Sequence, residues 1–279
     1  MRYLSVCSGI EAATVAWHPL GWEAVAYSEI ESFPRKLLQH HYPETPLHGD
    51  FTTIGENDYG AIDLLVGGTP CQAFSVAGLR KGFADARGNL TLEFIRLAQR
   101  KKPYWLVWEN VPGVLHQNEG RAFGAFLGGL AECGYGFAYR VLDAQYFGVP
   151  QRRCRVFVVA FLGDWRPAAA VLFESESLQG DNTPDRQKQK VGSVAPTLTK
   201  FGYGSRRSGE IQILCNDGSI RIATPREIER CFGFTDNYTL IPGASDIARA
   251  MALGNSMAVP VMGWLGKRIE MVEQQRTKD

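Results

Sequence analysis

The chain has 279 residues, of which 45% are hydrophobic and 21% are charged, and its formal net charge is +1. This length and composition suit one large α/β domain with a smaller lobe, or two modest domains, and exclude a disordered or fibrous protein. The nearly neutral charge gives no overall nucleic-acid footprint of the kind that a strongly basic domain shows. No stretch approaches the roughly 20 consecutive apolar residues of a membrane helix, and the N-terminus has no charged leader with a long apolar core, so we expect a cytoplasmic protein.

The cysteines and histidines give no metal signature. The six cysteines include no CxxC pair, and the five histidines include no HExxH spacing. We therefore expect reduced thiols and no bound metal.

Short apolar runs alternate with amphipathic segments along the first half of the chain. The strand-like runs are YLSV, AVAYS, AIDLLV and YWLVWEN, followed by two strands over 138–142 and 155–161. Helices are predicted over 11–20, 33–40 and 90–100 and just before Cys133. Such alternation is typical of an α/β fold with a doubly wound, mostly parallel sheet and helices on both of its faces.

The pattern changes from about residue 163 to residue 219, where the sequence is polar, rich in glycine and serine, and without a strong period. We place a second, small lobe here and divide the chain into a larger domain, 1–162 plus 254–279, and a smaller one, 163–253. Between residues 185 and 210, six basic residues stand against two acidic ones. This cluster fits either a basic patch or a solvated loop.

Three helices are predicted in the last part of the chain. Thr224 followed by Pro225 indicates an N-cap with a proline at the first helical position, and Ser245 is a second candidate cap. A C-terminal helix over 259–274 must dock against the rest of the protein, because it has one apolar side. That side consists of Val261, Met262, Trp264, Leu265 and Ile269.

The turn after the first predicted strand is where a sheet of this kind binds a ligand. It reads VCSGIEAA, in which Gly9 is a small residue, and Glu29 follows 20 positions later at the end of the second predicted strand. A carboxylate at that place suits the hydroxyl groups of a ribose, so the pair indicates a nucleoside cofactor. The fingerprint GxGxxG is absent, which argues against a nicotinamide cofactor.

A thiol and a carboxyl group follow two other predicted strands. Cys71 lies in GGTPCQAFSVAG, a loop rich in glycine and proline that comes directly after AIDLLV. Such a loop is an exposed and rigid place for a nucleophile, whereas an isolated free cysteine is more often a small buried residue. Glu109 ends the next strand, in WENVPG. Both groups are therefore expected at one edge of the sheet.

Nine segments occur in one order along the chain: VCSGIEAA, YSEIES, HGDFTTI, GGTPCQAFSVAG, RGNLTLEFIRL, WENVPGVL, FGVPQRRCRVFVVA, TPREIERCFGF and GNSMAVPV. In this order they resemble the bacterial and phage DNA cytosine-5 methyltransferases nearly from end to end. The PCQ loop, the ENV strand and QRRxR are the most specific of them. The resemblance implies a Rossmann-like, S-adenosylmethionine-dependent methyltransferase fold with a small target-recognition lobe, and S-adenosylhomocysteine as the product.

The resemblance also implies the chemistry. Carbon 5 of cytosine is too weak a nucleophile to take a methyl group unaided, so the Cys71 thiolate first adds to carbon 6 and Glu109 contacts ring nitrogen 3 and the exocyclic amine. Arg153 and Arg155 match positions that hold the cytosine, although their spacing alone also fits two surface arginines. The target base must leave the duplex to reach such a site. The sequence does not identify the base that removes the carbon 5 proton.

Ten positions match the family's cofactor contacts. They are Cys7, Gly9, Ile10, Glu29, Asp50, Phe51, Pro70, Leu90, Asn255 and Met257. The first motif departs from its usual form, since Ser5 replaces a common aspartate, Cys7 a common phenylalanine, and Glu11 and Ala12 a pair of glycines. Ala77 also stands where the family often has a serine. These departures bear on cofactor affinity rather than on cofactor identity.

Contacts to DNA are expected from three regions: the catalytic loop and the loop over 79–88, the QRR segment, and the small lobe. The residues are Gln72, Ser75, Arg80, Lys81, Arg87, Gln151, Lys200, Tyr203, Arg206 and Arg207. The partner is double-stranded DNA, and the enzyme is expected to act as a monomer. The small lobe is short for the family, so we expect a short or relaxed recognition site.

Two alternatives remain open, an RNA cytosine-5 methyltransferase and a catalytically silent DNA-binding homologue. The intact set of Cys71, Glu109, Arg153 and Arg155 argues against the second. Amino-group methyltransferases are disfavoured because no [DNS]PP[YFW] motif follows a strand. The recognition sequence, a phage or bacterial source, and the presence of a cognate restriction endonuclease are not decided by the sequence.

Overall fold

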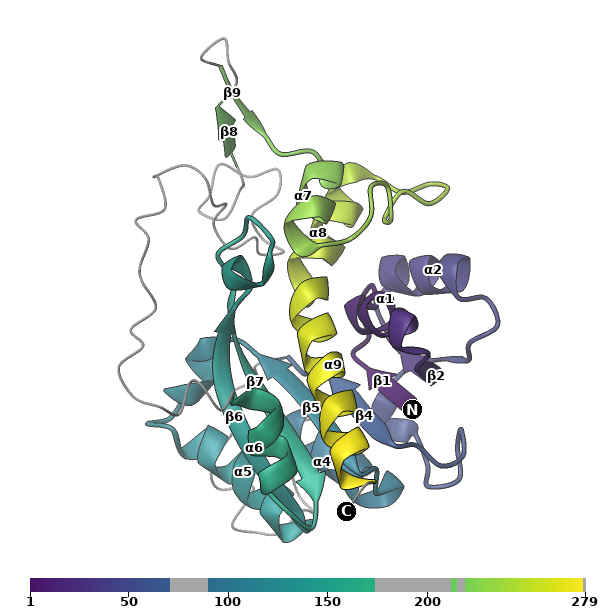
Figure 1. Ribbon diagram of the computed structural model, residues 1–279. Coiled ribbons are helices and arrows are strands. Elements are labelled where there is room, and N and C mark those ends of the chain that lie inside the picture. The colour runs from purple at the N-terminus through teal and green to yellow at the C-terminus, as the bar shows by residue number, and fades with distance from the viewer. Residues whose placement is uncertain (71–89, 174–211, 215–218, 278–279) are drawn as a thin grey trace.

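The computed structural model describes residues 1–70, 90–173, 212–214 and 219–277. Its centre is a seven-stranded sheet with the order β3-β2-β1-β4-β5-β7-β6 (Figure 1). The strands are β1 (Arg2–Val6), β2 (Glu23–Ser28), β3 (Leu47–His48), β4 (Leu64–Gly67), β5 (Trp105–Asn110), β6 (Tyr135–Asp143) and β7 (Cys154–Leu162). The four residues of β4 are all buried, as expected for a central strand that is covered on both faces.

The sheet confirms the predicted doubly wound, mostly parallel arrangement. Strands β3, β2, β1, β4 and β5 pair in parallel, and β7 pairs antiparallel with both β5 and β6. Since β7 runs against its neighbours, its first residues lie at the edge where β4 and β5 end. The segment QRRCR, which leads into β7, is thereby brought to the edge that carries the ends of the parallel strands.

Helices cover both faces of the sheet. On one face lie α4 (Leu90–Lys101) and α5 (Arg121–Glu132), whose apolar residues form one core cluster with β1, β4 and β5. On the other face lie α1 (Ala12–Trp17), α6 (Arg166–Leu172) and α9 (Val259–Arg276), which share a second cluster. Figure 1 shows α9 lying lengthwise across this face. The predicted helix over 11–20 divides at His18 into α1 and a 3-10 turn, His18–Leu20, that contains Pro19.

The C-terminal helix docks through the apolar side that the sequence indicates. Val261, Met262, Leu265 and Ile269 are buried in α9, and Trp264 is partly buried against the same cluster. The Trp17 indole of α1 donates a hydrogen bond to the Met262 carbonyl at 2.7 Å. The chain's last helix is thus joined to its first.

A third cluster of buried residues lies beside the sheet and joins α2 (Ser32–His41) to α7 (Pro225–Phe232) and α8 (Asp246–Asn255). Both predicted caps are confirmed, with Thr224 forming a capping box with Glu227 and Ser245 accepting from the Ala248 amide. A two-stranded ribbon, β8 (Gln212–Leu214) and β9 (Ile220–Ile222), leads into α7.

A buried ion pair fixes the turn between α7 and α8. Glu229 is fully buried and accepts hydrogen bonds from the backbone amides of Asn237 at 2.7 Å and Thr239 at 2.8 Å. Arg249 of α8 contacts the same carboxylate at 3.1 Å. Because a buried charge is tolerated only when it is paired and hydrogen-bonded, these contacts hold α7 and α8 in one arrangement.

The predicted boundary between the larger domain, 1–162 plus 254–279, and the smaller domain, 163–253, lies at residue 163. This division stays a prediction. Just beyond that boundary, α6 packs against β6, β7 and α9. Among the helices of the described residues, none has the length and apolar character that spanning a membrane requires.

Candidate active site

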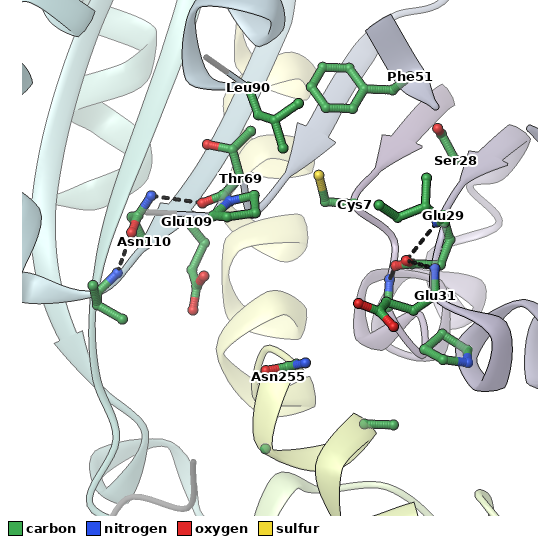
Figure 2. Close-up of a pocket in the computed structure, with 18 of the residues that line it drawn as sticks. Cys7, Ser28, Glu29, Glu31, Phe51, Thr69, Leu90, Glu109, Asn110 and Asn255 are labelled. Atoms are coloured by element: carbon green, nitrogen blue, oxygen red, sulfur yellow. Dashed lines mark hydrogen bonds between the residues drawn. The ribbon is translucent and has the colours of Figure 1, made fainter. Parts of the chain in front are cut away.

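The loops after β1, β2, β4 and β5 and the start of β7 surround one cavity of about 630 Å³ at the sheet edge. This is the size range of pockets that bind small ligands. Figure 2 shows Phe51 and Leu90 close together on one side of the cavity and Asn255 on another, with Cys7 between them. The cavity therefore extends from the end of β2 to the end of β5.

Glu29 holds the first two loops together at one end of the cavity. Its Oε2 accepts a hydrogen bond from the Gly9 amide at 2.7 Å, and its Oε1 accepts from the Ile30 and Glu31 amides, both at 2.8 Å (Figure 2). Gly9 has a φ of +55°, a conformation that glycine adopts readily. A carboxylate has about four acceptor sites, so Glu29 keeps capacity for a ligand hydroxyl beyond these three bonds.

Apolar and polar groups alternate along the neighbouring walls. Phe51 is buried in the core cluster against which Cys7 and Leu90 pack, and all three line the cavity. Asp50 caps a short 3-10 turn by accepting from the Thr52 amide at 3.0 Å. Burial, together with the charges of Glu29 and Asp50, raises the pKa of the Cys7 thiol to about 12, so this cysteine stays protonated at neutral pH.

Thr69 anchors the chain just before the predicted nucleophile. Its hydroxyl accepts from the Trp108 indole at 3.0 Å and contacts the Thr91 hydroxyl at 2.9 Å. Its carbonyl accepts from the Asn110 side chain at 3.0 Å (Figure 2). Cys71 lies two positions further on, outside the described residues. The last described residues before it are therefore fixed by β5 and α4.

Glu109 and two arginines form the charged end of the cavity. Arg155 Nε lies 3.2 Å from Glu109 Oε1, and each side chain is only 12% exposed. Among the described residues, no group makes a hydrogen bond of good geometry to Glu109 Oε1. Glu109 Oε2 would lie 3.2 Å from a Cβ placed on Gly68, so the carboxyl group is adjacent to the loop that leads to Pro70. A polar ligand at this place would find a buried carboxyl group with acceptor capacity.

The pKa of Glu109 is set by opposing effects. Burial raises it, the positive charges of Arg155 and then Arg153 lower it, and burial is the larger effect, so the pKa lies above its ordinary value. A carboxyl group with a raised pKa holds its proton at higher pH than a free one. It can then donate a hydrogen bond as well as accept one.

Arg153 joins the start of β7 to the other half of the chain. It is 3% exposed, and its guanidinium donates to the carbonyls of Gly254 at 3.2 Å and Ser256 at 2.7 Å. The same group lies over the Phe232 ring, 4.9 Å from its centroid. Burial and the neighbouring Arg155 lower the pKa of Arg153 to about 9, which leaves it protonated at neutral pH.

The structure brings most of the predicted cofactor residues together. Eight of them line the large cavity: Cys7, Gly9, Glu29, Asp50, Phe51, Pro70, Leu90 and Asn255. Met257 lines a smaller cavity beside it, which shares Cys7, Gly9 and Asn255. Ile10 is fully buried in the cluster formed with α7 and α8. Its side chain therefore supports the loop from behind.

The predicted DNA contacts lie almost entirely outside the described residues. This holds for Gln72, Ser75, Arg80, Lys81, Arg87, Lys200, Tyr203, Arg206 and Arg207. Gln151 is described and fully buried, and within the described part of the chain neither side-chain polar atom has a hydrogen-bond partner. Its contact with DNA stays a prediction.

Several residues that line the cavity were not predicted: Ser28, Ile30, Glu31, Pro34, Gly49, Gly68, Thr69, Asn110, Val111, Ala252 and Gly254. Most of them stand next to a predicted position in the same motif. That adjacency is the signal in the sequence that could have identified them as lining the cavity. Ile30 is the clearest case, because it directly follows Glu29 and is 69% exposed. Across the described residues, no group of three metal-ligating side chains occurs.

A family model and two relatives each match most of the chain. A family model described as C-5 cytosine-specific DNA methylase matches residues 1–201. The Type II methyltransferase M.SsoII of Shigella sonnei is 30% identical, over 96% of this chain and 79% of the relative. M.HhaI of Haemophilus parahaemolyticus, also a Type II methyltransferase, is 26% identical, over 96% of this chain and 94% of the relative.

A relative with a different name matches a smaller share of its own length. The DNA N-6-adenine-methyltransferase of Escherichia phage P1 is 42% identical over 75% of this chain, but the match covers only 34% of that relative. The chain thus spans about a third of the phage protein's length.

Solved structures show the same fold. The Dnmt2 methyltransferase of S. pombe superposes with a TM-score of 0.72 at 18% identity, over 99% of both chains. A DNMT2 mutant of Spodoptera frugiperda gives a TM-score of 0.73 at 20% identity, over 96% of this chain and 99% of the other. At these identities the likeness concerns the fold alone.

Proposed function

The chain belongs to the C-5 cytosine-specific DNA methylase family and is by class a DNA (cytosine-5-)-methyltransferase, and we propose that it methylates carbon 5 of a flipped cytosine in a short duplex DNA sequence. The observation that carries this proposal is the pairing of Glu109 with Arg155 at 3.2 Å, beside the loop that leads to Cys71. Both groups face the cavity that Glu29 closes at its other end.

The chemistry of the cavity wall fits S-adenosylmethionine, which supplies an electrophilic methyl group when it is bound. Glu29 offers a carboxylate with remaining acceptor capacity to the ribose hydroxyls, and Asp50 offers an acceptor to an adenine amine. Phe51, Leu90 and the exposed Ile30 provide apolar surface for the purine ring. These residues hold the donor, and none of them takes part in bond making.

Glu109 lies at the other end of the cavity, beside the residues that precede Cys71 in the sequence. The Cys71 thiolate forms a bond to carbon 6 of the cytosine, while Glu109 gives a proton or a hydrogen bond to nitrogen 3. The electron pair displaced by this addition makes carbon 5 nucleophilic. Carbon 5 takes the methyl group as the bond between that group and the donor's sulfur breaks, so that S-adenosylhomocysteine is the leaving group. Removal of the carbon 5 proton then returns an electron pair to the ring, and the Cys71 sulfur leaves as thiolate.

The two arginines have separate tasks in this scheme. Arg155 pairs with Glu109 and lines the cavity, where its guanidinium can donate to the carbonyl oxygen on carbon 2 of the cytosine. Arg153 is committed to the carbonyls of Gly254 and Ser256. It therefore contributes positive charge and fixed geometry to the wall that receives the base.

Product analysis tests the proposed reaction. Enzyme and S-adenosylmethionine with a labelled methyl group are incubated with unmethylated duplex DNA and, in parallel, with folded RNA. One portion of the DNA is digested to nucleosides, and another portion is sequenced after bisulfite treatment. We expect 5-methylcytosine in one short sequence context. Label in folded RNA alone, or DNA binding without methyl transfer, would instead support the RNA or the silent alternative.

A second candidate product comes from the phage P1 relative, which is named an adenine N6 methyltransferase. The match covers a third of that protein, and this chain has no [DNS]PP[YFW] motif after a strand. The nucleoside digest separates the two products, because N6-methyladenine and 5-methylcytosine are different compounds. Sedimentation of the enzyme with and without a DNA duplex tests the proposed monomer.

Glu29 gives a prediction for donor binding. Replacing Glu29 with glutamine removes the charge and one acceptor oxygen, so the dissociation constant for S-adenosylhomocysteine is expected to rise by about 10- to 100-fold. The rate at saturating donor should change much less. Calorimetric titration measures the affinity, and Glu31→Gln is the matched control because Glu31 lines the same cavity with no carboxylate contact to Gly9. Equal weakening in both variants would contradict the assigned role of Glu29.

A further inference from the structure

A carboxyl group is buried directly beneath the predicted cofactor loop. Glu11 follows the loop after β1 and is only 1% exposed. Its φ of 60° and ψ of 55° place it in the left-handed region, which residues other than glycine seldom adopt. The position combines an unfavourable backbone conformation with a buried ionisable group, so its contacts must offset both costs.

The contacts of Glu11 connect three elements. The Ser5 hydroxyl of β1 donates a hydrogen bond to Glu11 Oε1. Thr14 of α1 donates to Oε2 from its hydroxyl at 2.6 Å and from its amide at 3.2 Å. The Thr14 hydroxyl also contacts the phenols of Tyr3 at 2.7 Å and Tyr27 of β2 at 3.0 Å. Glu11 is thus the centre of a closed polar network inside the protein.

This network explains two departures of the first motif together. The resemblance to the DNA cytosine-5 methyltransferases implies an aspartate at the position of Ser5 and a glycine at the position of Glu11. In the structure these two side chains touch, so the Glu11 carboxyl occupies the space beside position 5. We propose that Glu11 is a positioning residue whose buried carboxyl group, placed just before α1, holds the loop after β1 and occupies the site where the resemblance implies an aspartate on β1.

The supported loop is the one that carries Gly9. The Glu11 amide donates to the Ser8 carbonyl at 3.0 Å, and the Ser8 hydroxyl donates to the Ser5 carbonyl at 3.0 Å. Beyond Ser8, the Gly9 amide donates to Glu29 at 2.7 Å. The Glu11 carboxyl group, through Ser5 and Thr14, joins the two ends of the loop, and the Gly9 amide within that loop is one of the donors that hold the Glu29 carboxylate. The part of this inference that concerns binding of the methyl donor, S-adenosylmethionine, rests on the proposed function.

The pairing predicts that positions 5 and 11 together tolerate only one carboxyl group. S5D should be harmful beside Glu11, because two carboxyl groups would then share a buried site and burial already raises the pKa of Glu11. In the E11G background the same S5D change should be beneficial. Neighbouring residues in one hydrogen-bond network show such non-additive effects.

The test is a double-variant cycle with two measurements. The midpoint of urea unfolding is measured without ligand, and the affinity for S-adenosylhomocysteine is measured by calorimetry. We expect S5D to lower the midpoint and to weaken binding by about tenfold or more, and S5D/E11G to recover most of both. S5N is the control of matched size, since its amide can donate to Glu11, and it should be milder than S5D.

Kinetics separates positioning from general loss of structure. E11G should raise the KM for the methyl donor and leave the single-turnover rate at saturating donor close to that of the wild type. Additive effects of S5D and E11G, or donor affinity unchanged in E11G, would overturn the proposal. If S5D fails to fold, recovery of folded protein in S5D/E11G supports the pairing and failure to recover overturns it.

The two measurements also separate this inference from the proposed function. A wild-type protein that binds no S-adenosylhomocysteine would contradict the proposed function, and the unfolding cycle would still report whether residues 5 and 11 share one carboxyl group. Rescue in the unfolding cycle without rescue of donor affinity would confine Glu11 to a structural role and overturn its positioning role.

Discussion

Replacing Cys71 with alanine is expected to lower methyl transfer to duplex DNA by at least about 10⁴-fold, because the variant lacks the thiolate that forms the bond to carbon 6 and so activates carbon 5. Transfer of labelled methyl groups in a single turnover measures the loss. A DNA duplex with fluorine in place of the target hydrogen at carbon 5 gives a second measurement. Fluorine does not leave as a cation, so the wild type should remain covalently attached to this DNA and the variant should not.

Cys133 provides the matched control for this prediction. It is a partly buried cysteine at the end of α5, and it does not line the cavity. Cys133→Ala should retain both transfer and covalent capture. The affinities of Cys71→Ala for DNA and for S-adenosylhomocysteine should remain near those of the wild type. Covalent capture of the fluorinated duplex by Cys71→Ala would identify another nucleophile and contradict the assignment.

The second large effect is expected at Glu109. The glutamine variant keeps the size of the side chain but cannot give a proton to nitrogen 3, so single-turnover transfer should fall by about 10²- to 10⁴-fold. Because Glu109 is buried, its pKa is raised, and the carboxyl group is protonated below that pKa. The wild-type rate should therefore decline as the pH rises through the raised pKa of Glu109.

The dependence on pH distinguishes this role from a structural one. A glutamine does not titrate in this range, so Glu109→Gln should lose the decline at higher pH that the wild type shows. Rates at saturating donor and DNA, measured across the pH range in single turnovers, test this directly. A decline of the same shape in the variant would assign the titration to another group that acts in its protonated form, and would contradict this role of Glu109.

The parallel part of the fold could be predicted because each strand and helix has a local signal. The run LLV in β4 is apolar throughout, as a central strand requires, and α7 and α8 begin at the predicted caps Thr224 and Ser245. The dense grouping of motif residues at the ends of β1, β2 and β4 also follows from sequence. Parallel strands end at a common edge, so their last residues must meet there.

Other features depend on contacts between distant parts of the chain. The position of β7 between β5 and β6 is a property of the whole sheet and has no local signal. Arg153 contacts carbonyls of Gly254 and Ser256, which lie about a hundred residues further on. The sequence marked Glu11 as an unusual residue in the first motif, but only the structure shows that Ser5 is its partner.

The contact between α1 and α9 bears on how far the length of the segment between α6 and α7 can vary. Trp17 donates to the Met262 carbonyl, and a Cβ on Gly266 would lie 2.5 Å from the same indole, so the two ends of the chain are closely fitted. The residues between α6 and α7 therefore connect points that the sheet and helices already fix. For a flexible connection between two fixed points, doubling the length costs only about 0.6 kcal/mol of loop-closure entropy. Insertions and deletions there should be absorbed without repacking the edge that carries Glu29 and Glu109.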